Sequence, residues 1–241
     1  MNDILEELSA LRREDVPPVA DFTAAFAGPG VHVIAELKKA SPSEGLIRRD
    51  FDPVRLAVEL EGAGAAALSV LCEPHRFLGS EAYLRAAHAA VRLPILYKDF
   101  VTTPYQVAAA RAAGASAVLL IAAVLADEPL VRLLNLVHEL GFSALVETHD
   151  ETEIDRAVKA GARIIGVNCR NLRTFQTDPA ITARLIGRIP PTCIRIAESG
   201  LRTAEDLQAL REKGANGFLV GTTLMRADRP GEKLRELRGE R

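Results

Sequence analysis

Apolar residues are grouped in eight short segments along the chain, and amphipathic stretches separate most of them. The segments are nearly continuous runs of Val, Ile, Leu and Ala, which is typical of parallel strands that are covered on both faces. They occupy residues 31–35, 66–71, 95–97, 117–121, 144–146, 164–167, 193–197 and 217–220. Helical periodicity is found between them, at residues 104–113, 128–140, 151–160 and 203–213. This alternation predicts a series of βα units.

Glycines mark the points at which the predicted helices return to the sheet. Each fits a helix C′ position, where a positive φ ends the helix. The glycines are Gly64, Gly114, Gly141, Gly161 and Gly214, four of them followed by alanine. Eight units favour a closed (β/α)8 barrel, the TIM-barrel form of the α/β class, with an open doubly wound sheet as the alternative.

No linker or change of composition divides the 241 residues, so we expect a single domain. Residues 31–241 would form the barrel and residues 1–30 a short N-terminal helical extension. The helix is predicted because one face of residues 1–15 carries Ile4, Leu5, Leu8 and Leu11. This segment is neither a signal peptide nor a membrane span, so the sequence predicts a soluble, cytoplasmic protein without a membrane partner.

Charge and cysteine content exclude several classes of function. Thirty Lys and Arg against 32 Asp and Glu give a formal charge of −2, which does not favour nucleic-acid binding. The odd number of cysteines, Cys72, Cys169 and Cys193, indicates small buried residues in a reducing compartment. Residues 62–67 match a dinucleotide fingerprint, but they precede a strand instead of following one. We therefore expect no nucleotide cofactor.

Polar side chains follow five of the predicted strands. In chain order these are Glu36 and Lys38, Lys98, Glu147, Asn168 and Arg170, and Glu198. The C-terminal ends of barrel strands meet at one mouth, where active sites lie, and alternation sends Glu36 and Lys38 to the same side. One such residue could simply mark where a strand leaves the core. Five strands together predict a catalytic site in which buried charges shift one another's pKa values.

Small residues in two late loops predict a phosphate site. Ser199 and Gly200 follow the seventh strand, and Gly221 and Thr222 follow the eighth, where backbone N–H groups can approach an anion. The loop at residues 38–50 is long and polar, and it contains Gly and Pro. It is either a solvated connection or a lid that carries Ser41 towards phosphate, and we favour the lid.

Other catalytic arrangements are missing from the sequence. The five histidines are scattered, without H-x-x-x-H, H-E-x-x-H or a Cys/His cluster, so no metal site is expected. No G-x-S-x-G elbow occurs, so a serine hydrolase is unsupported.

Eight ordered segments closely resemble indole-3-glycerol phosphate synthase. They are IAELKKASPS at residues 34–43, LSVL at 68–71, YKDF at 97–100, LLIAAVL at 119–125, LVETH at 145–149, IGVNCRNL at 165–172, AESGL at 197–201 and LVGTTLM at 219–225. The resemblance implies a cofactor-free enzyme of tryptophan biosynthesis, a carboxy-lyase. Its substrate would be 1-(2-carboxyphenylamino)-1-deoxyribulose 5-phosphate, which loses carbon dioxide and water to give indole-3-glycerol phosphate.

The resemblance also implies residue roles. Lys98 would be the general acid, Lys38 would contact the substrate carboxylate, and Glu147 would act as acid or base in dehydration. Glu36, Asn168 and Glu198 would orient these groups, while Ser41, Ser199, Gly200, Gly221 and Thr222 would hold phosphate and Arg170 would support the site. Phe77 or Phe100 could pack on the anthranilate ring or belong to the core. We expect a monomer whose partner is this small phosphorylated molecule.

Three rival interpretations remain on the residues alone. Lys98 could be the nucleophile of a Schiff-base aldolase, since it ends a strand beside carboxylates. The phosphate loops also suit a phosphosugar isomerase of the same pathway, although the lysine-rich first strand argues against it. A non-catalytic phosphate-binding barrel is the third, and the retained Lys98 and Glu147 argue against that.

Overall fold

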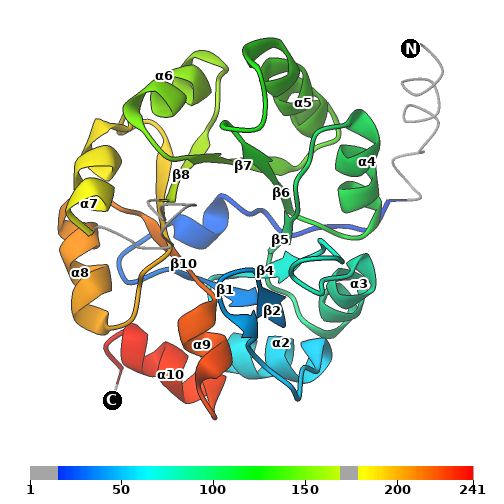
Figure 1. The fold of residues 1–241 in the computed structure, drawn as a ribbon, viewed down its shortest axis with the longest axis vertical. Helices are drawn as coiled ribbons and strands as arrows, with labels where there is room; N and C mark the ends of the chain where they lie inside the picture. Colours follow the sequence, from blue (N-terminus) through cyan, green and yellow to red (C-terminus); the bar gives the residue numbers. More distant parts are fainter. Residues whose placement is uncertain (1–15, 169–178, 241) are drawn as a thin grey trace.

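The computed structural model describes residues 16–168 and 179–240, and within them eight parallel strands close into a barrel. Neighbouring strands follow the order β1-β10-β9-β8-β7-β6-β5-β4, with β1 closing the ring against both β4 and β10 (Figure 1). The strands are Val33–Leu37 (β1), Ala67–Leu71 (β4), Ile95–Lys98 (β5), Ala117–Ile121 (β6), Ser143–Thr148 (β7), Ile164–Asn168 (β8), Ile194–Glu198 (β9) and Gly217–Val220 (β10). The predicted closed barrel is therefore confirmed, and the open sheet is excluded.

Helices surround the barrel and follow each of its strands. They are Pro53–Gly62 (α2), Glu81–Ala90 (α3), Pro104–Ala112 (α4), Asp127–Glu139 (α5), Glu151–Lys159 (α6), Pro179–Arg188 (α7), Ala204–Glu212 (α8), Thr222–Arg226 (α9) and Pro230–Leu237 (α10). Local sequence explains where several of them begin. For example, Thr103 and Gln106 form a capping box at the start of α4, and Thr203 and Asp206 do so at α8.

The five glycines predicted to end helices all have positive φ. Their φ values are 84° for Gly64, 93° for Gly114, 71° for Gly141, 86° for Gly161 and 99° for Gly214. Gly114 shows why alanine would not serve, because a Cβ there would lie 2.7 Å from Cγ of His88 in addition to the unfavourable φ.

Two apolar clusters form the core. The larger one lies between the barrel wall and the helices, and the smaller one fills the barrel interior with residues such as Ile34, Leu96 and Leu145. Phe22 and Phe26 belong to the smaller cluster and are 1% and 7% exposed. They contact each other at 5.4 Å between ring centroids, in an edge-on arrangement.

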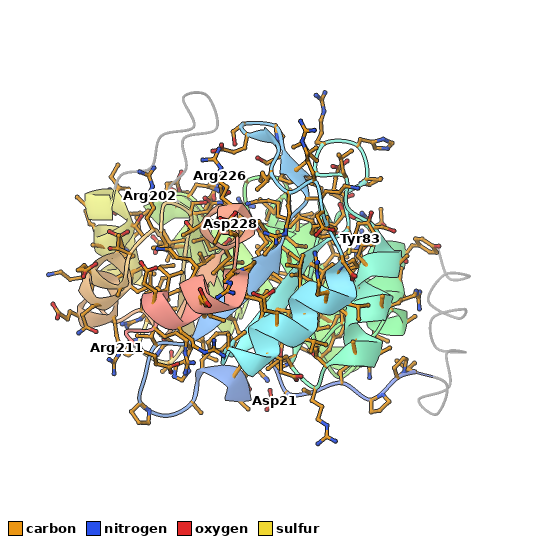
Figure 2. The ribbon with its side chains drawn as sticks, turned by 90° about the horizontal axis from the view of Figure 1, so that it is seen from below. Asp21, Tyr83, Arg202, Arg211, Arg226 and Asp228 are labelled. Atoms are coloured by element: carbon orange, nitrogen blue, oxygen red, sulfur yellow. The ribbon has the colours of Figure 1, made fainter. Side chains whose placement is uncertain are left out.

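The segment before β1 closes the N-terminal end of the barrel. Its described part contains one short 3-10 helix, Ala24–Phe26 (η2), which lies over the barrel centre in Figure 1. In Figure 2, Asp21 beside this segment and Arg226 of α9 lie at opposite ends of the barrel. The helix predicted around Ile4 to Leu11 falls outside the described residues. Within residues 16–30, η2 is the helical element that the structure describes.

Two small elements lie at the other end, beyond the strand C-termini. The loop after β1 forms an antiparallel hairpin of Ala40–Ser41 (β2) and Gly45–Leu46 (β3). Arg48, just after it, donates hydrogen bonds from Nη1 to the carbonyl oxygens of Met225 and Ala227, at 3.1 and 2.9 Å. These bonds connect the first loop to the end of α9. No described helix is long and apolar enough to cross a membrane.

Candidate active site

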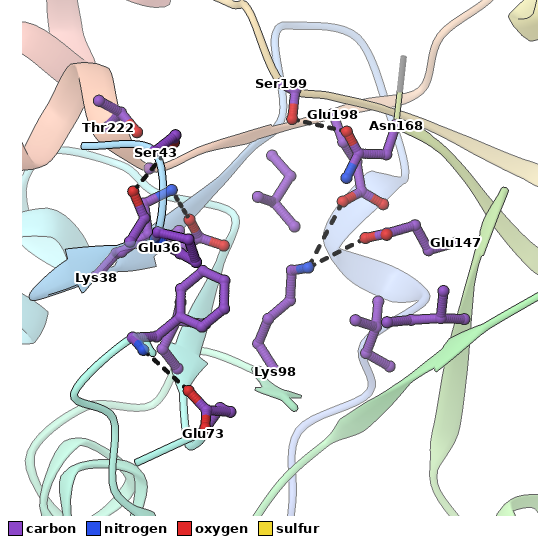
Figure 3. A pocket seen from close by; sticks show the side chains of 18 of the residues that line it. Glu36, Lys38, Ser43, Glu73, Lys98, Glu147, Asn168, Glu198, Ser199 and Thr222 are labelled. Carbon is purple, nitrogen blue, oxygen red and sulfur yellow. Dashed lines mark hydrogen bonds and ion pairs between the residues drawn. The ribbon is translucent and has the colours of Figure 1, made fainter. Parts of the chain in front are cut away.

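A cavity of about 380 Å³ opens at the C-terminal ends of the strands. Of the twelve residues predicted for the site, all but Arg170 line this cavity. They are Glu36, Lys38, Ser41, Lys98, Glu147, Asn168, Glu198, Ser199, Gly200, Gly221 and Thr222. These residues come from β1, β2, β5, β7, β8 and β9, from the loops that follow β1, β9 and β10, and from the first residue of α9. The barrel therefore brings sequence-distant charges together around one space (Figure 3). Cys169 and Arg170 fall outside the described residues.

Glu36 and Lys38 form an ion pair at one side of the cavity. Nζ of Lys38 lies 2.6 Å from Oε1 of Glu36, and their side chains are only 11% and 5% exposed. Strand alternation puts them on the same side, as the sequence predicted. Gly221 makes room for the pair, because a Cβ at that position would overlap with the Glu36 carboxylate and lie 3.0 Å from Nζ of Lys38. Gly221 therefore leaves the space in which this pair packs, whether or not its N–H binds an anion.

Lys98 lies between two carboxyl groups at the centre of the site. Its Nζ donates a hydrogen bond of 3.1 Å to Oε2 of Glu147 and lies 4.0 Å from Oε2 of Glu198 (Figure 3). Burial alone would lower the pKa of Lys98, but the negative charge of Glu147, with that of Glu36, outweighs burial and raises the pKa above its ordinary value. Lys98 therefore carries a proton at neutral pH, as a general acid must.

The two carboxyl groups beside Lys98 differ in their affinity for protons. Burial favours the neutral form of Glu147, yet the charge of Lys98 and hydrogen bonding by His149 lower its pKa below the usual range. Burial raises the pKa of Glu198 well above its usual value, and the negative charge of Glu147 adds to this. Of the two groups, Glu147 thus favours its ionised form and Glu198 its neutral form.

Gly166 provides the space that Glu198 occupies. A Cβ on this β8 residue would overlap with Oε1 of Glu198. That oxygen is buried and has no hydrogen-bond partner among the described residues. A glycine inside a strand often marks such a close approach, and this signal at Gly166 was available in the sequence but was not used.

Asn168 and Ser199 extend the polar rim towards the loop after β9. The hydroxyl of Ser199 donates a hydrogen bond of 2.8 Å to Oδ1 of Asn168. Ser199 has a φ of 65° and Gly200 a φ of 75°, so two consecutive residues adopt the left-handed conformation. For Ser199, which has a Cβ, this costs of order 1–3 kcal/mol and is found mainly at functional sites.

The loop after β10 adds a second polar group without a partner. Oγ1 of Thr222, the first residue of α9, is buried and forms no hydrogen bond within the described part of the chain. Ser41 approaches from the hairpin and is 4% exposed, with its hydroxyl 3.4 Å from that of Ser43.

Apolar side chains line another part of the cavity wall. They are Leu71, Phe77, Phe100, Leu119, Ile121, Val124 and Leu219. The rings of Phe77 and Phe100 lie 6.4 Å apart, and Phe100 is 48% exposed. Phe100 therefore belongs to the mouth, not to the core, and Phe77 contacts it there.

Four ionisable residues of the cavity were not among the predicted site residues: Glu73, Arg76, Asp99 and His149. His149 lines the site, and its Nε2 lies 3.4 Å from Oε1 of Glu147. The spacing of two residues from Glu147 equals that between Glu36 and Lys38, and it could have placed the ring on the same side of its strand. Within residues 16–168 and 179–240, no group of three or more His, Cys, Asp and Glu side chains is arranged to hold a metal ion.

The sequence matches the family model described as indole-3-glycerol phosphate synthase over residues 3–237. An indole-3-glycerol phosphate synthase of Koribacter versatilis is 50% identical over 210 residues, which are 87% of this chain and 81% of that protein. A protein of Streptomyces coelicolor named indole-3-glycerol phosphate synthase 2 is 47% identical over 235 residues, which cover 98% and 90% of the two chains.

Solved structures with low identity share the fold. Thiamine phosphate pyrophosphorylase from Pyrococcus furiosus matches with a TM-score of 0.65 at 14% identity, over 87% of this chain and 94% of that one. The N-acetylmannosamine-6-phosphate 2-epimerase from Clostridium perfringens gives 0.64 at 16% identity, over 85% and 90%. At these identities the likeness concerns the barrel alone.

Proposed function

The chain belongs to the indole-3-glycerol phosphate synthase family of tryptophan-biosynthesis carboxy-lyases, and from this premise we propose how its own residues carry out the ring closure. The substrate is 1-(2-carboxyphenylamino)-1-deoxyribulose 5-phosphate, and the product is indole-3-glycerol phosphate. The observation that carries the proposal is the position of Lys98, a protonated lysine held between Glu147 and Glu198 at the floor of an otherwise partly apolar cavity.

Lys98 acts as the general acid in ring closure. The aromatic carbon that bears the carboxylate attacks the ketone carbon, and the electron pair of the carbonyl moves to oxygen. That oxygen then takes a proton from the Lys98 ammonium. Proton transfer from a positioned group contributes typically about 10²–10⁴-fold. The raised pKa of Lys98 supports this role, because it keeps the proton in place until the substrate oxygen becomes basic.

Lys38 contacts the substrate carboxylate, with Glu36 fixing its position. After ring closure the bond to the carboxylate breaks, its electrons restore the aromatic ring, and carbon dioxide leaves. A lysine ammonium can hold the carboxylate while the ring closes, and Lys38 offers one at the cavity wall. Glu36 limits where that ammonium can move, since the pair is buried at 2.6 Å.

Glu147 acts as the base in dehydration. The hydroxyl formed at the former ketone carbon leaves as water after it takes a proton from one of the two lysines. A proton is removed from the neighbouring methylene carbon, and the double bond of the indole forms. The carboxyl group of Glu147 must be ionised to accept that proton, and its lowered pKa supports the assignment.

Two ends of the substrate are held by different parts of the cavity. The phosphate binds the loops with Ser199, Gly200, Gly221 and Thr222, with Ser41 approaching from the hairpin as a lid. The left-handed backbone at Ser199 and Gly200 and the unpaired hydroxyl of Thr222 support this placement. The anthranilate ring packs against Phe77 and Phe100. Asn168 and Glu198 orient the sugar hydroxyls, and Arg170 supports the site.

A Schiff-base mechanism has no support from the site. An amine must be unprotonated to attack a carbonyl, whereas the charge of Glu147 beside Lys98 raises the pKa of that lysine. Activated lysines of that kind require the opposite shift.

Turnover of the synthetic substrate, followed by indole fluorescence with carbon dioxide release measured in parallel, tests the function. Product formation without added metal or cofactor is expected. Folded protein that binds phosphate but forms no indole would contradict the proposal. We further propose a single-domain monomer that acts in the cytoplasm on this small molecule, and light scattering of the purified protein tests the monomer.

A further inference from the structure

His149 occupies a position between two acidic side chains. Its ring follows β7 directly, and Nε2 lies 3.4 Å from Oε1 of Glu147. On the other side, Nδ1 lies 3.0 Å from Oε2 of Glu153, in the first turn of α6. The ring is only 19% exposed, and the Glu147 and Glu153 side chains are 6% and 14% exposed. A partly buried imidazole with a carboxylate on each nitrogen favours the doubly protonated form.

Backbone contacts hold Glu153 in place. Its Oε2 accepts the backbone N–H of His149 at 2.8 Å, and its own N–H donates to Oδ1 of Asp150, the N-cap of α6, also at 2.8 Å. The same oxygen therefore fixes both the backbone and the ring of His149. The first turn of α6 thus determines where Nε2 points.

The two oxygens of Glu147 consequently have different partners. Oε2 accepts a hydrogen bond from Nζ of Lys98, while Oε1 faces Nε2 of His149. A carboxylate with one cation on each oxygen cannot rotate about its terminal bond without losing a contact. His149 thereby restricts Glu147 to the orientation in which Oε2 faces Lys98 and the cavity.

We propose that His149 is a positioning residue for the reaction, which acts through Glu147 by holding its carboxylate ionised and oriented, with Glu153 holding the ring. The inference rests on the proposed role of Glu147 as a base. It assigns a catalytic consequence to a contact that could otherwise be regarded as the cap of α6.

The charges of His149, Glu147 and Glu153 should make the rate of the reaction depend on pH. The charged groups that lie within 4 Å of the His149 ring in the described chain are Glu147 of β7 and Glu153 of α6. Hydrogen bonding to Glu147, reinforced by the charges of both carboxylates, raises the pKa of His149 to about 9. Deprotonation above that pH would remove one of the two cations beside Glu147, so turnover should fall there.

The test compares steady-state kinetics of His149→Gln with the wild-type enzyme across pH. Misplacing a catalytic group by about 1 Å can cost 10²-fold, so we expect kcat to fall by at least about ten-fold, with KM changed by less than about two-fold. The acidic limb of the kcat profile should move to higher pH, because loss of a cation raises the pKa of Glu147. The decline near pH 9 should disappear.

Glu153→Gln provides a second variant, because its amide oxygen can still accept the backbone N–H of His149 while the charge is lost. Removing this anion should lower the pKa of His149 and move the alkaline decline to lower pH. Asp206→Asn is the matched control. Asp206 accepts the backbone N–H groups of Arg202 and Thr203 at the start of α8, at 2.9 and 3.1 Å, in the same kind of cap. Its pH profile and kcat should equal those of the wild type.

The outcomes separate the inference from the proposed function. If the wild-type enzyme turns over the substrate and His149→Gln has the same kcat and pH profile, the inference is overturned and the proposed function stands. Lack of turnover in the wild type would overturn the function itself. If His149→Gln fails to fold by circular dichroism, Glu153→Gln decides, and an unchanged alkaline limb in that variant would overturn the inference.

Discussion

Nζ of Lys98 lies 3.1 Å from Oε2 of Glu147, although 49 positions separate the two residues in the sequence. The contact arises because β5 and β7 both end at the same mouth of the barrel, with β6 between them. Glu198 lies beside the pair and favours its neutral form. The site therefore holds both a proton donor and a proton acceptor before substrate arrives, and acid–base chemistry at one centre needs both.

Replacement of Lys98 by methionine should abolish most of the turnover. Lys98→Met keeps the length of the side chain but has no proton to give, so kcat should fall by at least about 10². Indole fluorescence under saturating substrate measures the change. A kcat within ten-fold of the wild type, in protein with normal circular dichroism, would refute the role of Lys98 as general acid.

Glu198→Gln should stabilise the protein at alkaline pH while lowering its activity. In the folded state the pKa of Glu198 is raised, so the carboxyl keeps a proton that the unfolded chain releases above about pH 4.5. Below that pH this proton makes its full contribution to the free energy of unfolding. As pH rises, the contribution declines by about 1.4 kcal/mol per pH unit while Glu198 stays protonated in the folded protein. Glutamine is neutral in both states and escapes the decline.

Urea unfolding of Glu198→Gln and the wild type at pH 5 and pH 8 measures the effect. The gain in unfolding free energy should be larger at pH 8. A gain that is constant between the two pH values would mean that Glu198 is ionised in the folded protein.

Arg48→Met should weaken substrate binding more than it weakens the fold. Arg48 attaches the end of the first loop to the carbonyl oxygens of Met225 and Ala227. Without these bonds the hairpin that carries Ser41 should spend more time away from the proposed phosphate site, raising KM several-fold, and net stability should fall by only about 1 kcal/mol per lost hydrogen bond. Arg55→Met, which removes an exposed ion pair with Asp50 nearby, is the control and should leave KM unchanged.

The barrel and most of its site could be predicted because their sequence signals are local and repeated. Each buried parallel strand is apolar on both faces, so the observed strands β6 and β10 coincide with the expected residues 117–121 and 217–220. Glu36 and Lys38 could be assigned to one side because a strand alternates with a period of two. The barrel topology then brings these side chains together, because the C-terminal ends of all its strands lie at the same mouth.

Other features depend on contacts that no local pattern specifies. The first loop was expected as a lid, and no secondary structure was predicted in it; the loop pairs with itself as β2 and β3. The bond that Arg48 makes to Met225 spans 177 positions. Phe22 and Phe26 were not singled out, because nothing near them in the sequence indicates that they close the barrel at the end opposite to the site.

Because Phe22 lies at the end of the barrel opposite to the site, separate mutations can change stability and catalysis independently. Phe22 is 1% exposed in the interior cluster, whereas Phe100 is 48% exposed at the mouth. Phe22→Ala should lower the free energy of unfolding by about 3–5 kcal/mol, because a buried ring leaves a cavity. At a temperature well below its melting point, its kcat and KM should remain near those of the wild type.

Phe100→Ala should change stability by less than about 0.5 kcal/mol, as surface substitutions do, yet raise KM several-fold by exposing the anthranilate ring to water. Denaturant unfolding and steady-state kinetics on both variants distinguish the two ends. Loss of activity in folded Phe22→Ala would show that the closed end of the barrel also shapes the site.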